Sequence, residues 1–127
     1  MIVRLPAKYL FAIVEQMGNR SYLGELELMV LLALVRLGDE AYGVPISKEL
    51  LNLAGRDVAL GSVYAALERL EQKEFVTSTL GEPTAERGGR AKRYFRVTPA
   101  GLRALKETRK ALTNLWSGVP LLEGKRT

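Results

Sequence analysis

Apolar residues along the first half of the chain repeat at the spacing of α-helices. A first helix is predicted after Pro6 and before Gly18, where one stripe is formed by Leu10, Ile13, Val14 and Met17. Between Leu26 and Leu37 nearly every position is apolar, which predicts a helix buried on most of its sides. Two shorter amphipathic segments, Gly43–Leu53 and Ser62–Lys73, predict two more helices, with Val44, Ile46, Leu50 and Leu53 expected in the core of the former.

The pattern changes after residue 74. Phe75–Leu80 and Lys92–Val97 are rich in β-branched and aromatic residues and predict two strands, joined by the glycine-rich loop Gly81–Arg90. Thr98 and Pro99 then predict the start of a last helix, with Thr98 as the N-cap. The apolar seam of that helix consists of Leu102, Leu105, Leu112, Leu115 and Trp116.

This order of elements predicts a mainly α fold with a small β hairpin, which is the layout of a winged helix-turn-helix flanked by N- and C-terminal dimerisation helices. Gly43–Leu53 and Ser62–Lys73 would form the helix-turn-helix, and the second would be the reading helix. A length of 127 residues fits one domain. We expect four parts: an N-terminal helical extension (1–20), a DNA-binding domain (21–98), a C-terminal dimerisation helix (99–117) and a tail (118–127).

Charge is distributed unevenly along the chain. Residues 1–60 hold six basic and seven acidic side chains, whereas residues 61–127 hold 13 basic and seven acidic ones. Nine basic residues fall within Arg87–Lys110, against Glu107 alone. Such a segment indicates contact with a polyanion, although a solvated basic face is the alternative.

Double-stranded DNA is the partner that this fold and this charge favour together. On the reading helix, small residues at the start would let it enter a groove, and a tyrosine and an arginine could donate to phosphates or bases. The expected DNA-binding residues are Ser62, Tyr64 and Arg69 on the helix and Arg87, Arg90, Lys92 and Arg93 around the hairpin loop. A winged-helix protein-interaction module without sequence-specific DNA binding is the alternative function.

Two absences bear on chemistry. The chain has no cysteine and no histidine, which removes disulfides, the commonest general base and the commonest transition-metal ligands. Its carboxylates are scattered, so we expect no enzyme, no metal and no cofactor. The apolar runs are too short for a signal peptide or a membrane span, and we expect a cytoplasmic protein that does not contact membranes.

Several motifs in order closely resemble the PadR family of bacterial transcriptional regulators. The resemblance covers about residues 22–117. Its strongest parts are Gly61-Ser-Val-Tyr64 followed by Leu67-x-Arg-Leu70, and the second strand running into Thr98-Pro-Ala-Gly101. It implies a dimeric winged-helix repressor of the short form, which lacks an extended C-terminal domain.

The resemblance also implies how the protein would assemble and respond. N- and C-terminal helices build the dimer in that family, which here points to Leu28, Leu32, Leu105, Leu112 and Leu115. Some members respond to small aromatic compounds, so Trp116 is the candidate for binding such an effector. Packing of this tryptophan in the dimer interface is the other interpretation. Two-fold symmetry predicts an inverted-repeat operator.

The chain departs from the family pattern at two points near the reading helix. Ala59 stands where the family commonly has a serine N-cap, so one backbone N–H loses its usual acceptor. Glu74 stands where the family favours glycine after that helix, a position at which a left-handed backbone is expected. Residues 1–20 lie outside the shared pattern.

Overall fold

The structure is a computed structural model that describes residues 23–82 and 91–122. Its elements are α2 (Glu25–Leu37), the short 3-10 helix η1 (Gly38–Glu40), α3 (Gly43–Ala54), α4 (Leu60–Gln72), β1 (Val76–Leu80), β2 (Arg93–Val97) and α5 (Pro99–Trp116). The order and type of these elements confirm the predicted winged helix-turn-helix. The expected helix before Gly18, the loop residues Arg87 and Arg90, and the end of the tail lie outside the described residues.

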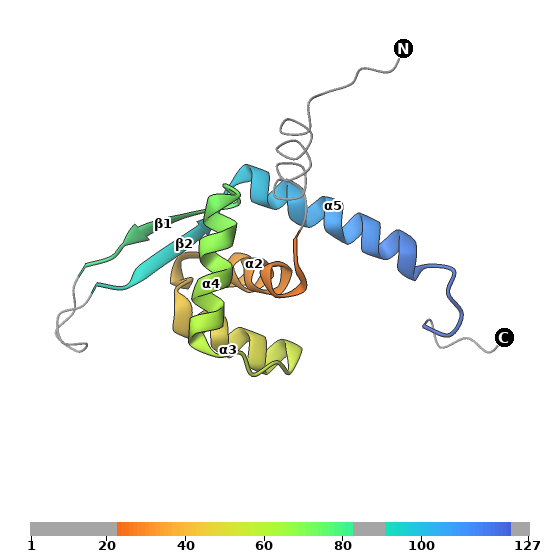
Figure 1. Ribbon diagram of the computed structural model, residues 1–127, viewed down its shortest axis with the longest axis horizontal. Helices are drawn as coiled ribbons and strands as arrows, with labels where there is room; N and C mark the ends of the chain where they lie inside the picture. The colour runs from red at the N-terminus through yellow and green to blue at the C-terminus, as the bar shows by residue number, and fades with distance from the viewer. Residues whose placement is uncertain (1–22, 83–90, 123–127) are drawn as a thin grey trace, which may run out of the picture.

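Helix α2 lies at the centre of the fold, and α3, α4, β2 and α5 all pack against it (Figure 1). Its near-continuous apolar sequence is what allows one 13-residue helix to face several neighbours. The largest fully buried side chains include Leu31 and Leu34 on α2, Ile46 on α3, and Leu67 and Leu70 on α4. The core is therefore a three-helix core built around α2.

Some apolar positions are more exposed than the sequence suggests. Leu53, expected in the core, is 61% exposed, because it lies in the last turn of α3 and lines an open hollow between α3 and α2. Leu32 and Val35 of α2 are also exposed, so this helix is not covered on every side by its own chain. The reading helix α4 begins at Leu60, two residues before the predicted start.

The hairpin is antiparallel, with Val76 opposite Val97 and Ser78 opposite Phe95. Figure 1 shows it projecting from the helical body on the side away from the free end of α5. One further backbone hydrogen bond holds it in place: the amide N of Phe95 donates to the carbonyl O of Ala41 over 2.8 Å. Phe95 and Ala41 are both buried, so the root of the hairpin belongs to the core.

The turn between α4 and β1 has the geometry of a Schellman motif. The amide of Phe75 donates to the carbonyl of Leu70 and the amide of Glu74 to that of Glu71, each over 2.9 Å. Glu74 has a φ of 64°, the left-handed conformation expected at this position. A Cβ makes that conformation cost about 1–2 kcal/mol, which glycine would avoid.

The first turn of α5 is anchored to this same turn. Thr98 Oγ1 donates to the carbonyl of Glu74 over 2.7 Å, and it accepts from the amide of Gly101 over 3.0 Å, which confirms the predicted N-cap. Gly101 packs directly on the backbone of Phe75, and a Cβ there would collide with the Phe75 carbonyl oxygen. The close approach explains the glycine, since no larger residue fits.

The backbone at Glu74 gives the first prediction. Glu74→Gly should raise the free energy of unfolding by about 0.5–1 kcal/mol, because relief of the left-handed strain exceeds the cost of the greater freedom of glycine in the unfolded chain. Glu68→Gly, on the exposed side of α4 with ordinary helical geometry, is the control and should lower stability by about 1 kcal/mol. Urea unfolding followed by circular dichroism measures both. Destabilisation by Glu74→Gly would show that the Schellman turn carries no strain.

Candidate nucleic-acid interface

The first turn of α4 is exposed, and two of its residues, Gly61 and Ser62, have little or no side chain. Ala59 is the N-cap and supplies no side-chain hydrogen bond, as the sequence indicates. Leu60, Gly61 and Ser62 are exposed, and a Cβ on Gly61 would meet open space. Backbone N–H groups at a helix N-terminus favour negative charge, and Gly61 and Ser62 leave room beside them, next to the half-exposed Leu60.

Tyr64 joins the two helices of the helix-turn-helix. Its ring lies over Gly43, the first residue of α3, so closely that a Cβ on Gly43 would collide with the hydroxyl. The residue is still 38% exposed. Tyr64 therefore packs on its neighbour helix and keeps part of its surface available to solvent.

A buried carboxylate connects α2 to the end of α4. Glu27 is 6% exposed, and its two oxygens accept from different residues: Oε1 from Lys73 Nζ at 2.5 Å and Oε2 from Arg69 Nε at 3.1 Å. Burial raises the pKa of Glu27, but the hydrogen bonds and charges of Lys73 and Arg69 outweigh it and hold the pKa below the ordinary value of 4.5. The group is therefore ionised at neutral pH.

The sequence suggests that Arg69 points outward from α4, but in the structure only part of its side chain does so. Its side chain is 48% exposed while its Nε is bound to Glu27. Glu27 was not among the site residues predicted from the sequence, although a signal was present: an acidic residue flanked by Leu26 and Leu28 in a largely apolar helix needs a cationic partner when that helix is buried.

Aromatic residues hold the hairpin near the loop end of its strands. The rings of Tyr42 and Tyr94 meet edge to face, with centroids 5.4 Å apart. Lys92 Nζ lies 4.6 Å from the Tyr42 ring centroid and donates to the Tyr42 hydroxyl over 3.4 Å. Lys92 is thus held against the body, whereas the adjacent Arg93, the first residue of β2, is exposed.

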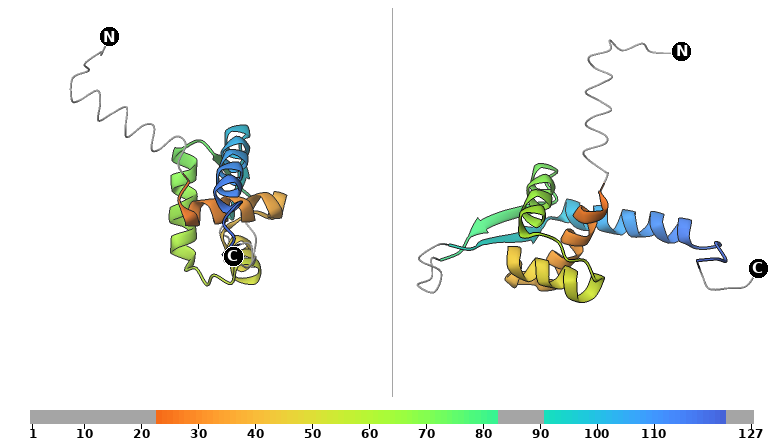
Figure 2. Two further views of the ribbon diagram at one scale, coloured as in Figure 1. Left: turned by 90° about the vertical axis from the view of Figure 1, so that its right-hand side faces the viewer. Right: turned by 60° about the horizontal axis from the view of Figure 1, so that its bottom comes forward.

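The basic segment that is continuous in sequence is divided in space. Arg93 and Arg96 lie on β2, and Arg96 Nη2 pairs with Asp39 Oδ1 at 3.0 Å. The four others that the structure describes beyond the hairpin, all exposed, lie along α5: Arg103, Lys106, Arg109 and Lys110. Figures 1 and 2 show the hairpin and the free end of α5 pointing in opposite directions. The basic residues that the structure describes on β2 and on α5 therefore do not form one cluster in space, and their contact with DNA stays a prediction.

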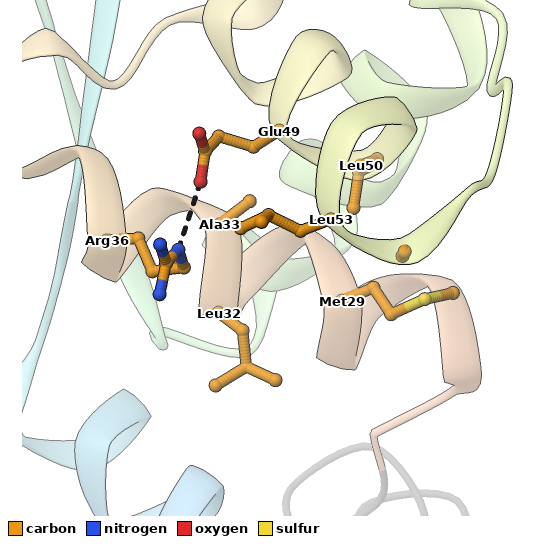
Figure 3. A pocket seen from close by; sticks show the side chains of 8 residues that line it. Met29, Leu32, Ala33, Arg36, Glu49, Leu50 and Leu53 are labelled. Atoms are coloured by element: carbon orange, nitrogen blue, oxygen red, sulfur yellow. Dashed lines mark hydrogen bonds and ion pairs between the residues drawn. The ribbon is translucent and has the colours of Figure 1, made fainter.

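Apolar side chains of α2 line two open hollows on the surface. Helices α2 and α5 enclose a hollow of about 330 Å³ whose rim includes Lys106 and Arg109 and whose apolar lining consists of Leu28, Leu32, Leu105 and Leu112. A second hollow lies between α2 and α3, bordered by Met29, Leu53 and the ion pair in which Arg36 Nε lies 3.0 Å from Glu49 Oε2 (Figure 3). Leu32 lines both, so the open apolar surface of α2 continues from one to the other.

The expected dimerisation residues fall into two groups. Leu105 is 9% exposed and packs in the core of its own chain, and Leu28 is half-buried. Leu112 and Leu115, at 45% and 75% exposed, project from α5. Trp116 ends α5 and is 57% exposed, one turn beyond the last residue of the α2–α5 hollow.

Two other classes of site are absent from the described ranges. Nowhere in residues 23–82 and 91–122 do three His, Cys, Asp or Glu side chains lie together as a metal site would require. Among the helices that the structure describes, none combines the length and apolarity needed to cross a membrane.

Comparison with known proteins agrees with this architecture. A family model described as the transcriptional regulator PadR-like family matches residues 31–107. Transcriptional regulator Rv3488 of Mycobacterium tuberculosis (strain ATCC 25618 / H37Rv) is 38% identical over 77 residues, which cover 61% of this chain and 67% of the relative.

Solved structures extend the likeness beyond that segment. A PadR family transcriptional regulator from Eggerthella lenta DSM 2243 is 28% identical with a TM-score of 0.60, and the match covers 94% of this chain and 100% of that one. A PadR-like regulator from Bacillus cereus strain ATCC 14579 has a TM-score of 0.63 at 24% identity, covering 80% of this chain and 93% of that one, which shows the shared fold. The winged-helix arrangement is therefore common to this chain and to transcriptional regulators.

Proposed function

This chain belongs to the PadR-like family of transcriptional regulators, and from that premise we propose that it is a dimeric repressor that binds an inverted-repeat operator in double-stranded DNA. The observation that carries the proposal is the exposed, uncapped first turn of α4, next to a hairpin whose root is fixed in the core. A helix start with small residues can approach base edges closely, and a rigid hairpin can hold its charges against the adjacent phosphates. Residues 21–98 would form this DNA-binding part, in the cytoplasm of a bacterium.

In this proposal the two elements have different tasks. Ser62 and Arg69 would contact base edges, and Tyr64 would donate to a phosphate. The hairpin would contribute charge through Arg87, Arg90, Lys92 and Arg93. Since Lys92 is held by Tyr42, Arg93 is the described hairpin residue whose charge is most available.

Salt dependence distinguishes the two tasks. Arg93→Ala should flatten the slope of log K against log salt by about 0.9 for each phosphate that the arginine neutralises, to a similar extent on operator and random duplexes. Ser62→Ala should instead weaken the operator selectively, because one base contact contributes about 1–3 kcal/mol of discrimination. Lys110→Ala, on the part of α5 that points away from the hairpin, is the control and should leave the slope unchanged.

The outcomes of that salt series also test the function itself. The operator is taken from the duplexes that the wild-type protein selects out of a random pool, and its half-sites should lie about 10 bp apart or a multiple of that spacing. A wild-type protein that selects no sequence, or an Arg93→Ala variant with an unchanged slope, would contradict DNA reading and favour the protein-interaction module.

Dimerisation is proposed through α5 together with α2 and the N-terminal extension. Its support is the exposed apolar surface of Leu32, Leu112 and Leu115, because a small chain rarely leaves such a patch uncovered. Leu112→Asp combined with Leu115→Asp should convert a dimer into a folded monomer. Leu105→Asp would unfold the chain instead, because that residue lies in the core. Light scattering at micromolar concentration measures the mass, and a monomeric wild-type protein would refute the proposal.

A small aromatic effector is proposed to bind near Trp116 and relieve repression. The α2–α5 hollow supplies an apolar lining next to two cations, which suits a flat molecule with an anionic group. Titration with simple phenolic acids should change the tryptophan fluorescence, and Trp116→Phe should abolish that signal. If Trp116→Ala leaves affinity, measured by calorimetry, unchanged, the effector does not contact this residue.

A further inference from the structure

Arg69 has a divided environment. Its Nε is bonded to Glu27, yet its side chain is 48% exposed. Within the described part of the chain, no acceptor is hydrogen-bonded to its two Nη nitrogens. One edge of the guanidinium is therefore fixed to the protein interior, and the other edge is available to a ligand.

The partner of that fixed edge is itself rigid. Glu27 is 6% exposed and lies in the first turn of α2, and its second oxygen accepts a hydrogen bond from Lys73. Each of the two carboxylate oxygens therefore has its own cationic donor, and Arg69 uses only its Nε for this.

We propose that Glu27 is a positioning residue for DNA specificity: it holds Arg69 by its Nε so that the Nη edge is presented to DNA in one orientation. This inference rests on the proposed DNA-binding function. A planar guanidinium held at one edge can make the paired hydrogen bonds that a base or a phosphate accepts, whereas a freely rotating one must lose entropy to do so. The carboxylate thus links the central helix α2 to the surface of the reading helix α4.

The test measures two quantities: the preference for operator over random DNA, and the salt dependence of binding, which depends on charge. Glu27→Gln should lower the ratio of random-duplex Kd to operator Kd about fivefold or more, the lower end expected for one well-made base contact. The salt slope should stay unchanged, because Arg69 keeps its charge. Glu49→Gln, which removes another ion pair between two helices, is the matched control and should leave both quantities unchanged.

A double-mutant cycle separates positioning from a general loss of stability. In an Arg69→Met background, Glu27→Gln should have no further effect on the ratio, because the residue through which it acts is gone. If Glu27→Gln does not fold, Arg69→Lys replaces it as the test. The lysine keeps the charge and can still pair with Glu27, but it lacks the free guanidinium edge. The ratio of Kd values should therefore fall while the salt slope stays unchanged. Circular dichroism establishes that each variant compared is folded.

The results that overturn the inference differ from those that overturn the function. A wild-type protein that does not prefer its selected operator refutes the proposed function. A wild-type protein that does prefer it, together with an unchanged ratio in Glu27→Gln or Arg69→Lys, refutes the positioning role alone. An equal fall of the ratio in the presence and absence of Arg69 also refutes that role.

Discussion

The fold depends on one constraint, which is that helix α2 must satisfy four neighbours at once. Helices α3, α4 and α5 and strand β2 all pack on it, so few of its positions can hold a polar side chain. Glu27 is the exception, and its burial is tolerable because α4 brings two cations to it. This buried polar connection therefore joins the central helix α2 to the C-terminal end of α4.

The extent to which sequence predicts this structure varies with the physical origin of each feature. Periodicity located the helices that the structure describes, because each has an apolar face that must be buried, and β-branched and aromatic composition located the hairpin. The family pattern located the left-handed turn at Glu74, a local backbone property that a departure from glycine makes visible. In contrast, Leu53 looked like a core residue, since periodicity cannot show where a neighbouring helix stops covering it.

Long-range electrostatic pairing was harder to foresee. The basic residues from Arg93 to Lys110 lie within one stretch of the sequence. A strand followed by a long helix places them in different parts of the molecule. The pairing of Arg69 with Glu27 spans 42 positions and depends on how α2 and α4 cross. Charge counts along a chain contain neither kind of information. Lys92 is held by Tyr42 whereas Arg93 is exposed, so even adjacent residues differ.

The anchoring of α5 at one end has a mechanical consequence. Thr98 is hydrogen-bonded to Glu74 and Gly101 packs on Phe75. In contrast, every residue from Arg109 to Trp116 is exposed in the single chain. An 18-residue helix is about 27 Å long, and Ala104 and Leu105 also hold its first half in the core. A tilt of that held part by only a few degrees would move the far end by about 2 Å, on the order of the shifts that accompany switching between states. The packing around Phe75, Gly101 and Leu105 therefore sets the geometry at the far end of α5.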